Sequence, residues 1–247
     1  MYDVSTRKRT LGLVAQGRSL SSVSLETGIS RAAIRSWQNR LEPLPRIAPQ
    51  EPGPPADECA YAYLLGLYLG DGCISGHPRT GYYLRIACAN SWPGLIDACE
   101  IAMRAVNPTG RSYRTQAQGY VSVVGYSRHW PRLFPQHGPG KKHERPIVLA
   151  PWQQAIVEAH PWAFIRGLIH SDGCRITNWT TRTVAGERKR YEYPRYFFTN
   201  VSVDIMRLFT RALDQVGVDW KQANARNISI ARKASVALMD DHVGPKY

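Results

Sequence analysis

The same short pattern occurs twice in this chain, as YLLGLYLGDGCIS at 63–75 and as FIRGLIHSDGCRI at 164–176. Each copy is an apolar, helix-like run that ends in a small residue, Asp, Gly and Cys. Asp71 and Asp172 hold the same place in the two copies, 172 − 71 = 101 residues apart. A carboxylate in the last turn of a helix is disfavoured by the helix dipole unless a cation compensates it. Two such residues, each before a glycine that lets a helix end in the left-handed conformation, predict a paired acidic site for divalent metal.

The duplication extends past these two segments. In the first repeat, strands and a helix are predicted at 81–90, 93–106 and 110–126, followed by a short helix. In the second repeat they are predicted at 174–200, 203–217 and 219–231, followed by the helical segment KASVALMDD. This alternation predicts an α+β fold in which the unit α-β-β-α-β-β-α occurs twice.

Polar residues are repeated as well as apolar ones. Asn90 aligns with Asn200, and HGPGK aligns without a gap on HVGPK, which places Lys141 against Lys246. A duplication retained for packing alone would not need to keep such residues. They therefore indicate a symmetric site.

Small residues lie four positions apart in both copies of the pattern, as Gly66 and Gly70 in the first and as Gly167 and Ser171 in the second. This spacing lets two helix backbones approach closely. We therefore expect the two helices to pack side by side as the seam between the repeats, with their C-terminal ends together.

This arrangement would bring Asp71 and Asp172 to one place. Two carboxylates repel each other at close range, and oxygen-ligated Mg²⁺ or Mn²⁺ would relieve that repulsion. The backbone carbonyls of Gly70 and Ser171 are candidates for further ligands. In a basic protein the expected substrate is a phosphodiester, because metal ions activate water and stabilise the leaving oxygen. The aligned lysines are candidate catalytic residues that would neutralise charge in the transition state.

The charge of the chain indicates a nucleic-acid partner. Lys and Arg number 32 against 19 Asp and Glu, a net charge of +13. That surplus favours a protein that binds a polyanion over a basic protein with no such partner. Of the polyanions, it favours nucleic acid over a membrane surface. No window approaches the roughly 18 apolar residues of a membrane span. The five cysteines form no CxxC pair, which is typical of reduced thiols in a cytosolic protein and argues against zinc. We expect a cytoplasmic, DNA-associated protein.

A proline-rich segment divides the chain. Residues 42–57 read EPLPRIAPQEPGPPAD, and the six prolines exclude a helix or a central strand, which predicts an extended linker. The predicted domains are a head at 1–41, the linker, and the two repeats at 58–149 and 150–247.

The head is predicted to contain three helices. The first is TRKRTLGLVAQGR, the second is capped by Ser21 or Ser22 and ends at Gly28, and the third is capped by Ser30. The turn ETGIS between the last two is typical of a helix-turn-helix, and the head resembles that of transposases and resolvases. The expected core consists of Leu11, Val14, Leu20, Val23, Ile29, Ile34 and Trp37.

The third helix of the head would present Arg31 and Arg35 to DNA phosphates and base edges. A three-helix scaffold or a protein-docking module is the alternative. Basic residues at the recognition position, and not on an arbitrary face, favour DNA binding.

Strand residues are the candidate DNA readers of the duplicated part. Side chains alternate between the two faces of a strand, and β-ribbons can enter the major groove. The hairpin at 182–196 has no counterpart in the first repeat, so we expect asymmetric contacts and a non-palindromic target. The candidates are Arg85, Arg111, Tyr113, Arg175, Thr177, Trp179, Arg190, Arg195, Lys221, Gln222, Asn224 and Arg226.

The segments LLGLYLGDG and IRGLIHSDG resemble the LAGLIDADG motif of homing endonucleases. The resemblance covers roughly residues 58–247 and implies two four-stranded antiparallel sheets that form a saddle on DNA, with the motif helices at the interface between repeats. It implies that Asp71 and Asp172 bind the divalent metals. It also implies a basic residue near each site, for which Lys141 or Lys142 and Lys246 are the candidates.

Two features depart from the family pattern. The sixth motif position, commonly Asp, is Leu69 in one copy and His170 in the other. His170 either tunes the second site or is an interface residue. The second departure is the head, because some members of the wider family are transcription regulators that keep the saddle, lose the acidic residues and carry a helix-turn-helix. This chain has the head but retains both Asp residues.

The sequence therefore predicts a monomer with internal pseudo-two-fold symmetry that cleaves double-stranded DNA site-specifically with Mg²⁺ or Mn²⁺. The first alternative is a non-cleaving, sequence-specific transcription regulator that retains the same fold. The second is a maturase-like, RNA-binding splicing cofactor.

Overall fold

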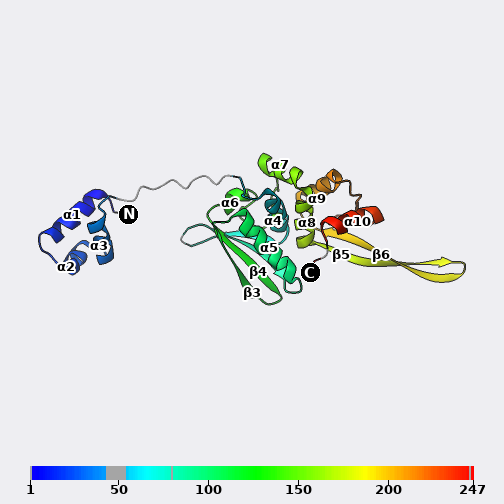
Figure 1. The fold of residues 1–247 in the computed structure, drawn as a ribbon, viewed down its shortest axis with the longest axis horizontal. Coiled ribbons are helices and arrows are strands. Elements are labelled where there is room, and N and C mark those ends of the chain that lie inside the picture. Colours follow the sequence, from blue (N-terminus) through cyan, green and yellow to red (C-terminus); the bar gives the residue numbers. More distant parts are fainter. Residues whose placement is uncertain (1, 43–53, 79, 245) are drawn as a thin grey trace. The chain divides into compact units, whose positions relative to one another are not determined.

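The computed structural model describes residues 2–42, 54–78, 80–244 and 246–247. They belong to two compact units, Met1–Glu51 and Pro52–Tyr247. Figure 1 shows the first as a small helical head and the second as a larger body of helices and sheets. The predicted linker at 42–57 lies largely outside the described residues.

The head consists of three helices: α1 (Val4–Ala15), α2 (Leu20–Thr27) and α3 (Arg31–Asn39). Ser30 caps α3 by accepting a hydrogen bond from the backbone N–H of Ala33, as expected for a serine at this position. Gly28 ends α2 in the left-handed conformation, with φ of 68°. Both features agree with the sequence analysis.

The start of α2 differs from the prediction. Its N-cap is Ser19, not Ser21 or Ser22, and the Ser19 hydroxyl accepts a hydrogen bond from the backbone N–H of Ser22. The core of the head is the predicted one: Val23, Ile29, Ile34 and Trp37 are buried, with Leu11, Val14 and Leu20 packed against them.

Each repeat of the body contains seven elements in the same order. Repeat 1 comprises α4 (Glu58–Asp71), β1 (Gly72–Gly76), β2 (Tyr82–Ala89), α5 (Pro93–Val106), β3 (Arg111–Ala117), β4 (Tyr120–Ser127) and α6 (Trp130–Leu133). Repeat 2 comprises α8 (Pro161–Asp172), β5 (Gly173–Val184), β6 (Glu187–Thr199), α9 (Val203–Gln215), β7 (Lys221–Asn224), β8 (Asn227–Ile230) and α10 (Lys233–His242). The two antiparallel sheets have matching orders, β1-β2-β4-β3 and β5-β6-β8-β7. The predicted duplicated α+β unit is confirmed.

Two short helices, η1 (Lys142–Glu144) and α7 (Pro151–Ala159), connect the repeats and were not predicted. Gln153 of α7 is fully buried. Its side chain accepts a hydrogen bond from the N–H of Ala150 at 2.9 Å and donates one to the Tyr61 hydroxyl at 2.7 Å. The connection is therefore fastened to the core of repeat 1.

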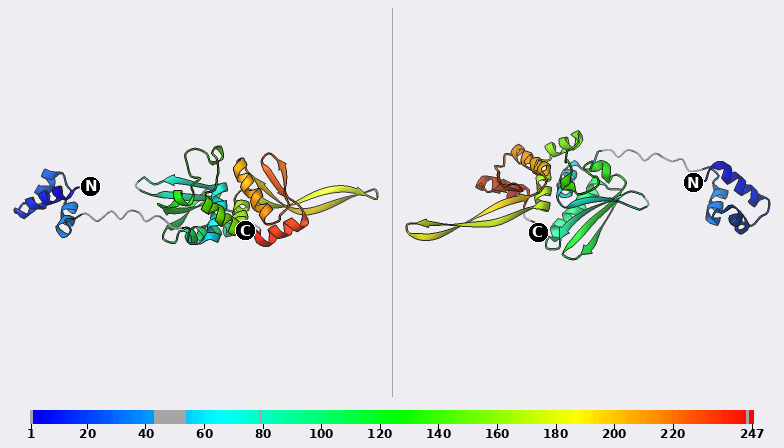
Figure 2. Two further views of the ribbon diagram at one scale, coloured as in Figure 1. Left: turned by 90° about the horizontal axis from the view of Figure 1, so that it is seen from above. Right: turned by 180° about the vertical axis from the view of Figure 1, so that it is seen from behind.

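Helices α4 and α8 pack against each other at the centre of the body, with one sheet on either side (Figures 1 and 2). A Cβ atom added at Gly66 would lie 2.6 Å from the carbonyl oxygen of Phe164 and 2.7 Å from the backbone N of Leu168. Gly70 lies against the side chain of Ser171, whereas a Cβ atom at Gly167 would lie 2.2 Å from the carbonyl oxygen of Tyr63. Glycine is required at the contact because one helix backbone touches the other, as the spacing of small residues predicted.

Each sheet has one face covered by helices and one open face. In β2, the buried Leu84, Ile86 and Cys88 belong to the hydrophobic core, whereas Tyr83 and Arg85 lie on the opposite, open face. In repeat 2 the helix-covered face carries Phe198 of β6, whose ring centroid lies 4.3 Å from that of Phe209 of α9. The open faces are the ones available to a large ligand.

Strands β5 and β6 extend beyond their sheet as a two-stranded ribbon. They pair continuously from Gly173 opposite Phe198 to Val184 opposite Glu187, whereas the pairing of β1 with β2 covers only Gly72–Gly76. Because β8 pairs with β6 only over 196–199, the ribbon at 177–194 has no third strand. Figure 2 shows it projecting from the body. This ribbon contains most of the hairpin that has no counterpart in repeat 1.

None of the helices in the described ranges is long and apolar enough to cross a membrane.

Candidate metal and DNA site

Asp71 and Asp172 are the last residues of α4 and α8, the two helices that form the seam. The glycines that follow do not adopt the predicted left-handed conformation. Gly72 has φ of −95° and Gly173 has φ of −105°, and both continue directly into strands. Their small size is needed for another reason: a Cβ at Gly72 would lie 2.8 Å from the carbonyl oxygen of Tyr68, and one at Gly173 would lie 2.7 Å from Cα of Ile169. The chain turns too sharply out of each helix for a side chain.

The two carboxylates lie close enough to influence each other. Burial, and then the negative charge of Asp71, raise the pKa of Asp172 to about 6. Burial also raises the pKa of Asp71 above its ordinary value, while Lys246 and Lys142 oppose that shift. Burial and mutual repulsion both disfavour two ionised carboxylates at this place, and a bound divalent cation would offset both effects.

Lys142 lies at the C-terminal end of α4. Its ammonium group donates hydrogen bonds to the carbonyl oxygens of Tyr68, Gly70 at 3.0 Å and Gly72 at 2.9 Å. The carbonyl of Tyr68 also accepts the backbone N–H of Gly72. The lysine thus caps the end of the helix and offsets its dipole. Burial lowers the pKa of Lys142 to about 8, although Asp172 and Asp71 oppose that shift.

Lys246 does the same for α8. It donates a hydrogen bond to the carbonyl oxygen of Ser171 at 3.0 Å, and burial lowers its pKa below the usual range. Among the charges that act on Asp71, Lys246 has the largest effect, and among those that act on Lys142, Asp172 has the largest. Each lysine is therefore coupled most strongly to the carboxylate of the other repeat.

The gap-free alignment of Lys141 with Lys246 needs correction by one residue. The Lys141 side chain is 71% exposed and lies 3.3 Å from Glu144. Lys142, the next residue, occupies the position in repeat 1 that Lys246 occupies in repeat 2. The 3-10 turn η1 begins at Lys142, and the sequence alone offered no way to choose between two adjacent lysines.

The donor set fits a hard divalent cation. Two carboxylates and the carbonyls of Gly70 and Ser171 supply only oxygen atoms, the ligand type that Mg²⁺ and Mn²⁺ prefer. Each carbonyl already accepts a hydrogen bond from a lysine and keeps a second lone pair. Within the described ranges no group of three or more His, Cys, Asp or Glu side chains could hold a metal ion. An ion here would therefore complete its shell with water or phosphate oxygens.

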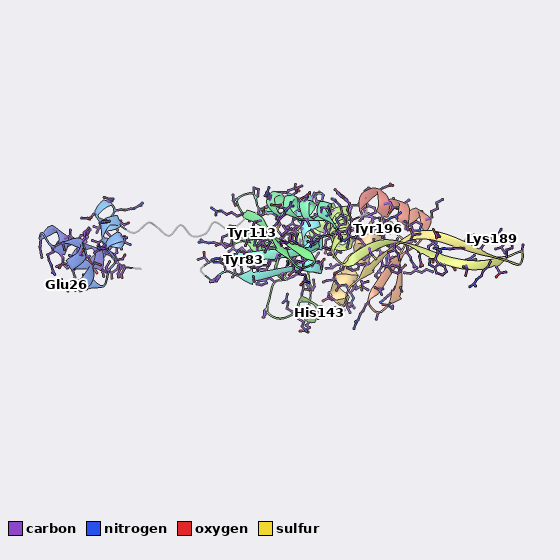
Figure 3. The ribbon with its side chains drawn as sticks, turned by 90° about the horizontal axis from the view of Figure 1, so that it is seen from below. Glu26, Tyr83, Tyr113, His143, Lys189 and Tyr196 are labelled. Carbon is purple, nitrogen blue, oxygen red and sulfur yellow. The ribbon has the colours of Figure 1, made fainter. Side chains whose placement is uncertain are left out.

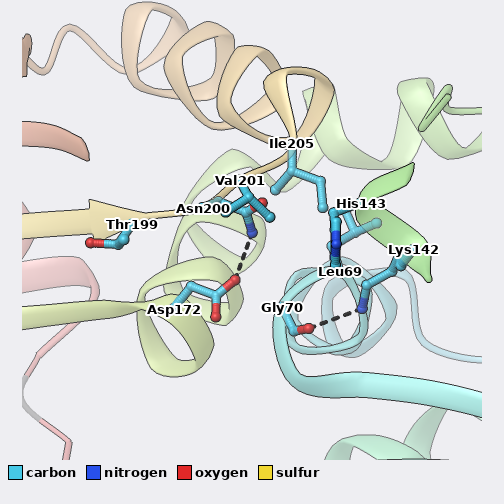
Figure 4. Close-up of a pocket in the computed structure, with 9 residues that line it drawn as sticks. All are labelled: Leu69, Gly70, Lys142, His143, Asp172, Thr199, Asn200, Val201 and Ile205. Atoms are coloured by element: carbon cyan, nitrogen blue, oxygen red, sulfur yellow. Dashed lines mark hydrogen bonds between the residues drawn. The ribbon is translucent and has the colours of Figure 1, made fainter. Parts of the chain in front are cut away.

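A cavity of about 270 Å³ opens beside Asp172. Asn200 donates a hydrogen bond of 2.7 Å to Oδ2 of Asp172, and Lys142 reaches the carbonyl of Gly70 on the opposite wall, as Figure 4 shows. Apolar side chains close part of the remaining wall. The cavity is lined by Leu69, Gly70, Lys142, His143, Asp172, Thr199, Asn200, Val201 and Ile205.

His170, at the sixth motif position, is an interface residue. It is 3% exposed, and its Nδ1 lies 3.0 Å from the Tyr63 hydroxyl of the facing helix. Burial, with Arg166 and Lys246 nearby, lowers its pKa to about 4. It is therefore neutral at pH 7 and packs in the seam.

The candidate DNA readers of repeat 1 share one face. In β4, Val124 lies opposite Arg85 of β2 on one side and opposite Tyr113 of β3 on the other. Tyr126 of β4 lies opposite Arg111 of β3. Residues directly opposite in an antiparallel pair point to the same side, so Arg85, Arg111 and Tyr113 all lie on the open face. Figure 3 shows Tyr83 and Tyr113 together on this sheet.

The two candidates at the start of β5, Arg175 and Thr177, lie on the helix-covered face. Arg175 pairs with the buried Tyr196, which places it and Thr177 on the helix-covered side. Its guanidinium forms two hydrogen bonds with Asp240 of α10, at 2.6 and 2.7 Å. Arg175 therefore fastens α10 to the sheet. The sequence misled here because YEYPRYFFTN has aromatic residues on both faces of β6.

The other candidates in repeat 2 divide between four places. Arg195, Lys221 and Asn224 lie on the open face with Ser229 and Asn227 of β8. Gln222, opposite Ile228, lies on the helix-covered side but is exposed, and Arg226 is in the turn before β8. Trp179 and Arg190 are on the ribbon, where the Arg190 guanidinium lies 5.0 Å from the centroid of the Trp179 ring.

In the head, Arg31 and Arg35 are exposed on α3, opposite the buried Ile34 and Trp37. The amphipathic character of α3 leaves these arginines available to a ligand.

Comparison with solved structures identifies the fold of the body. A structure of mesophilic variants of the homing endonuclease I-DmoI is 16% identical over 75% of this chain and 90% of that chain, with a TM-score of 0.50. I-DmoI in complex with DNA and Mn is 14% identical over 77% of this chain and 98% of that chain, with a TM-score of 0.49. The N-terminal LAGLIDADG domain of DUF199/WhiA is 13% identical over 76% of this chain and 83% of that chain, with a TM-score of 0.45. No protein-family profile and no curated protein sequence matches the chain. The I-DmoI variant structure shows that the body has the LAGLIDADG fold, which the motif resemblance implied.

Proposed function

We propose that this chain, whose body has the LAGLIDADG fold, is a site-specific endonuclease that hydrolyses double-stranded DNA with a divalent metal ion. The observation that carries the proposal is the pair of carboxylates at the seam. Asp71 and Asp172 end two helices at their negative poles, and partial loss of solvent around the carboxylates raises the pKa of both. Such a placement is unfavourable for folding unless it serves the binding of a cation.

In this proposal Asp71 and Asp172 hold Mg²⁺ or Mn²⁺, with the carbonyls of Gly70 and Ser171 as further candidate ligands. The ion would supply Lewis acidity toward a phosphodiester oxygen and activate water. Lys142 and Lys246 offset the negative helix ends, and their ammonium groups would also offset the charge that develops on a phosphoryl group bound beside the carboxylates. That two of the similar solved structures contain DNA with Mn or Ca is consistent with this choice of ion.

Double-stranded DNA would lie on the open faces of the two sheets. The proposed contacts in repeat 1 are Arg85, Arg111 and Tyr113, and those in repeat 2 are Arg195, Lys221, Asn224 and the ribbon with Arg190. The net charge of +13 supports a polyanionic ligand. We further propose that the head is a helix-turn-helix module that contacts DNA through Arg31 and Arg35, and that the protein acts as a DNA-associated monomer.

A non-cleaving transcription regulator is the competing function, and the head is the feature that favours it. A protein that only binds DNA has no need for two neighbouring carboxylates at the C-terminal ends of helices. The retained Asp pair and the lysines beside it therefore favour the nuclease.

The test is selection from a randomised duplex library with the full-length protein. Ca²⁺ would be used to enrich bound sequences, and Mg²⁺ or Mn²⁺ to detect cleavage of the enriched duplex. Double-strand breaks in wild type and none in Asp71→Asn would support the nuclease. Enrichment without cleavage under any metal would leave the regulator as the function.

A further inference from the structure

Asn90 and Asn200 are equivalent in the backbone of the two repeats. Each follows the second strand of its sheet. The N–H of Asn90 donates to the carbonyl of Gly119 at 3.2 Å, and that of Asn200 donates to the carbonyl of Arg226 at 3.0 Å. Both acceptors lie in the turn between the last two strands of the repeat. The backbones of the two asparagines therefore occupy equivalent positions in the two repeats.

Their side chains nevertheless have different partners. Asn200 donates to Oδ2 of Asp172 at 2.7 Å. Asn90 instead accepts a hydrogen bond from the Gln116 side chain at 3.1 Å. In the described part of the chain the Asp71 carboxylate has no hydrogen-bond partner. One carboxylate of the pair is held by an amide and the other is not.

The register of the strands explains this difference. Gly72, after the first Asp, pairs with Ile86, so Asn90 lies 90 − 86 = 4 residues farther along β2 and the turn. Gly173 pairs with Phe198, so Asn200 lies only 200 − 198 = 2 residues farther. Two residues of strand correspond to about 7 Å and preserve the face. Asn90 is thus displaced along the strand from Asp71, and the residue at +2 in repeat 1 is the buried Cys88, whose thiol offers no comparable donor.

The amide bond fixes Asp172 in one orientation. Asn200 takes one lone pair of Oδ2, and the remaining lone pairs of the carboxylate are left for a cation beside the cavity of about 270 Å³ that Asp172 lines. Asn200 is itself held in place, because its Oδ1 accepts a hydrogen bond from the N–H of Ser202 at 2.8 Å. Asp71 has no such support. Partners of this kind typically contribute a factor of 10–100 in metal affinity.

We propose that Asn200 is a positioning residue for Asp172 alone, so that the two carboxylates bind divalent metal with unequal affinity. This inference deepens the metal site of the proposed function, but it concerns metal binding and is tested without DNA cleavage. The chain is thus pseudo-symmetric in fold but asymmetric in its chemistry.

The proposal is tested by titrating full-length protein with Mn²⁺ and following the free ion by electron paramagnetic resonance. Asn200→Ala is expected to weaken the tighter class of Mn²⁺ sites about tenfold or more. Asn90→Ala removes the equivalent side chain, which does not contact Asp71, and should leave Mn²⁺ binding unchanged. Equal affinities in wild type and both variants would overturn the proposal.

Asn200→Ser separates positioning from folding. A serine hydroxyl can still accept from the N–H of Ser202, so α9 keeps its start, but it is too short to reach Asp172. This variant should unfold at the wild-type temperature and bind Mn²⁺ as weakly as Asn200→Ala. Wild-type Mn²⁺ affinity in Asn200→Ser would show that Asn200 acts only on the fold.

Discussion

Gly66 and Gly167 face each other across the seam of the body, so closely that a Cβ on Gly66 would lie 2.8 Å from the carbonyl carbon of Gly167. This contact is made of backbone on both sides. It fixes how near the C-terminal ends of α4 and α8 come to each other, and hence how near the two carboxylates lie.

Gly66→Ala is expected to destabilise the body by about 1–3 kcal/mol or more, because the added methyl group meets helix backbone that cannot move aside. Chemical denaturation measures the effect. Gly76→Ala is the matched control, since a Cβ there would meet nothing within 4 Å. Equal stabilities for the two variants would disprove the backbone contact.

Asp71→Asn and Asp172→Asn should each abolish cleavage while leaving DNA affinity largely intact. Removing one negative charge ends the repulsion in the metal-free protein, so neither variant should be less stable than wild type without metal. Gel-shift and cleavage assays on the same duplex give the comparison. A double variant that cuts at the wild-type rate would end the nuclease proposal.

Without metal, wild type should lose stability as pH rises from about 4 to 6. The pKa of Asp172 is raised to about 6 in the folded protein, above the unfolded value of about 3.9. In that window the folded state binds more protons, so its stability falls as pH rises and stays low above pH 6. The loss should be on the order of 2 kcal/mol relative to Asp172→Asn. Parallel pH profiles of the two proteins would contradict this assignment.

Lys142→Met and Lys141→Met differ by one position and should behave differently. Lys142 caps α4 and is coupled to both carboxylates, so its loss should lower cleavage by at least tenfold and also destabilise the helix end. Lys141 is exposed, so its loss should leave cleavage at the wild-type rate. Single-turnover rates at saturating protein separate the two. The reverse result would restore the gap-free alignment of the repeats.

Deleting residues 1–41 should weaken binding and shorten the protected DNA site without changing the cleavage rate at saturating protein, because two linked binding modules reinforce each other. Arg31→Ala combined with Arg35→Ala should reproduce much of the loss and reduce the salt dependence of binding, by about one unit of slope for each lost phosphate contact. Footprints of equal length and affinity would mean that the head does not contact DNA.

Sequence patterns predicted the structure best where one residue type has one physical use. The spacing of Gly66 and Gly70 predicted the seam, and the repeated order of elements predicted both sheets. It was weaker where a pattern permits two outcomes. Gly72 follows a helix, but its small size serves close packing against Tyr68 and not a left-handed turn.

Arg175 shows a second limit. Strand alternation correctly grouped it with Thr177, but it could not identify the covered face, because Tyr196 and Phe197 are both aromatic and only Tyr196 is buried. The acidic partner, Asp240, lies 65 residues away in α10. Asn200 was recognised as a repeated residue, but its contact with Asp172 depends on a strand register that the sequence does not specify.

The ribbon at 177–194 has a thermodynamic consequence. A two-stranded hairpin with both faces in water has no hydrophobic core of its own and is at best marginally stable. Its backbone amides should therefore exchange with solvent deuterium faster than those of the adjoining four-stranded sheet. If the ribbon becomes ordered only on DNA, part of the binding free energy is spent on folding it. Repeat 2 would then bind with a larger entropy loss than repeat 1, so its half of the target would be the more temperature-sensitive one.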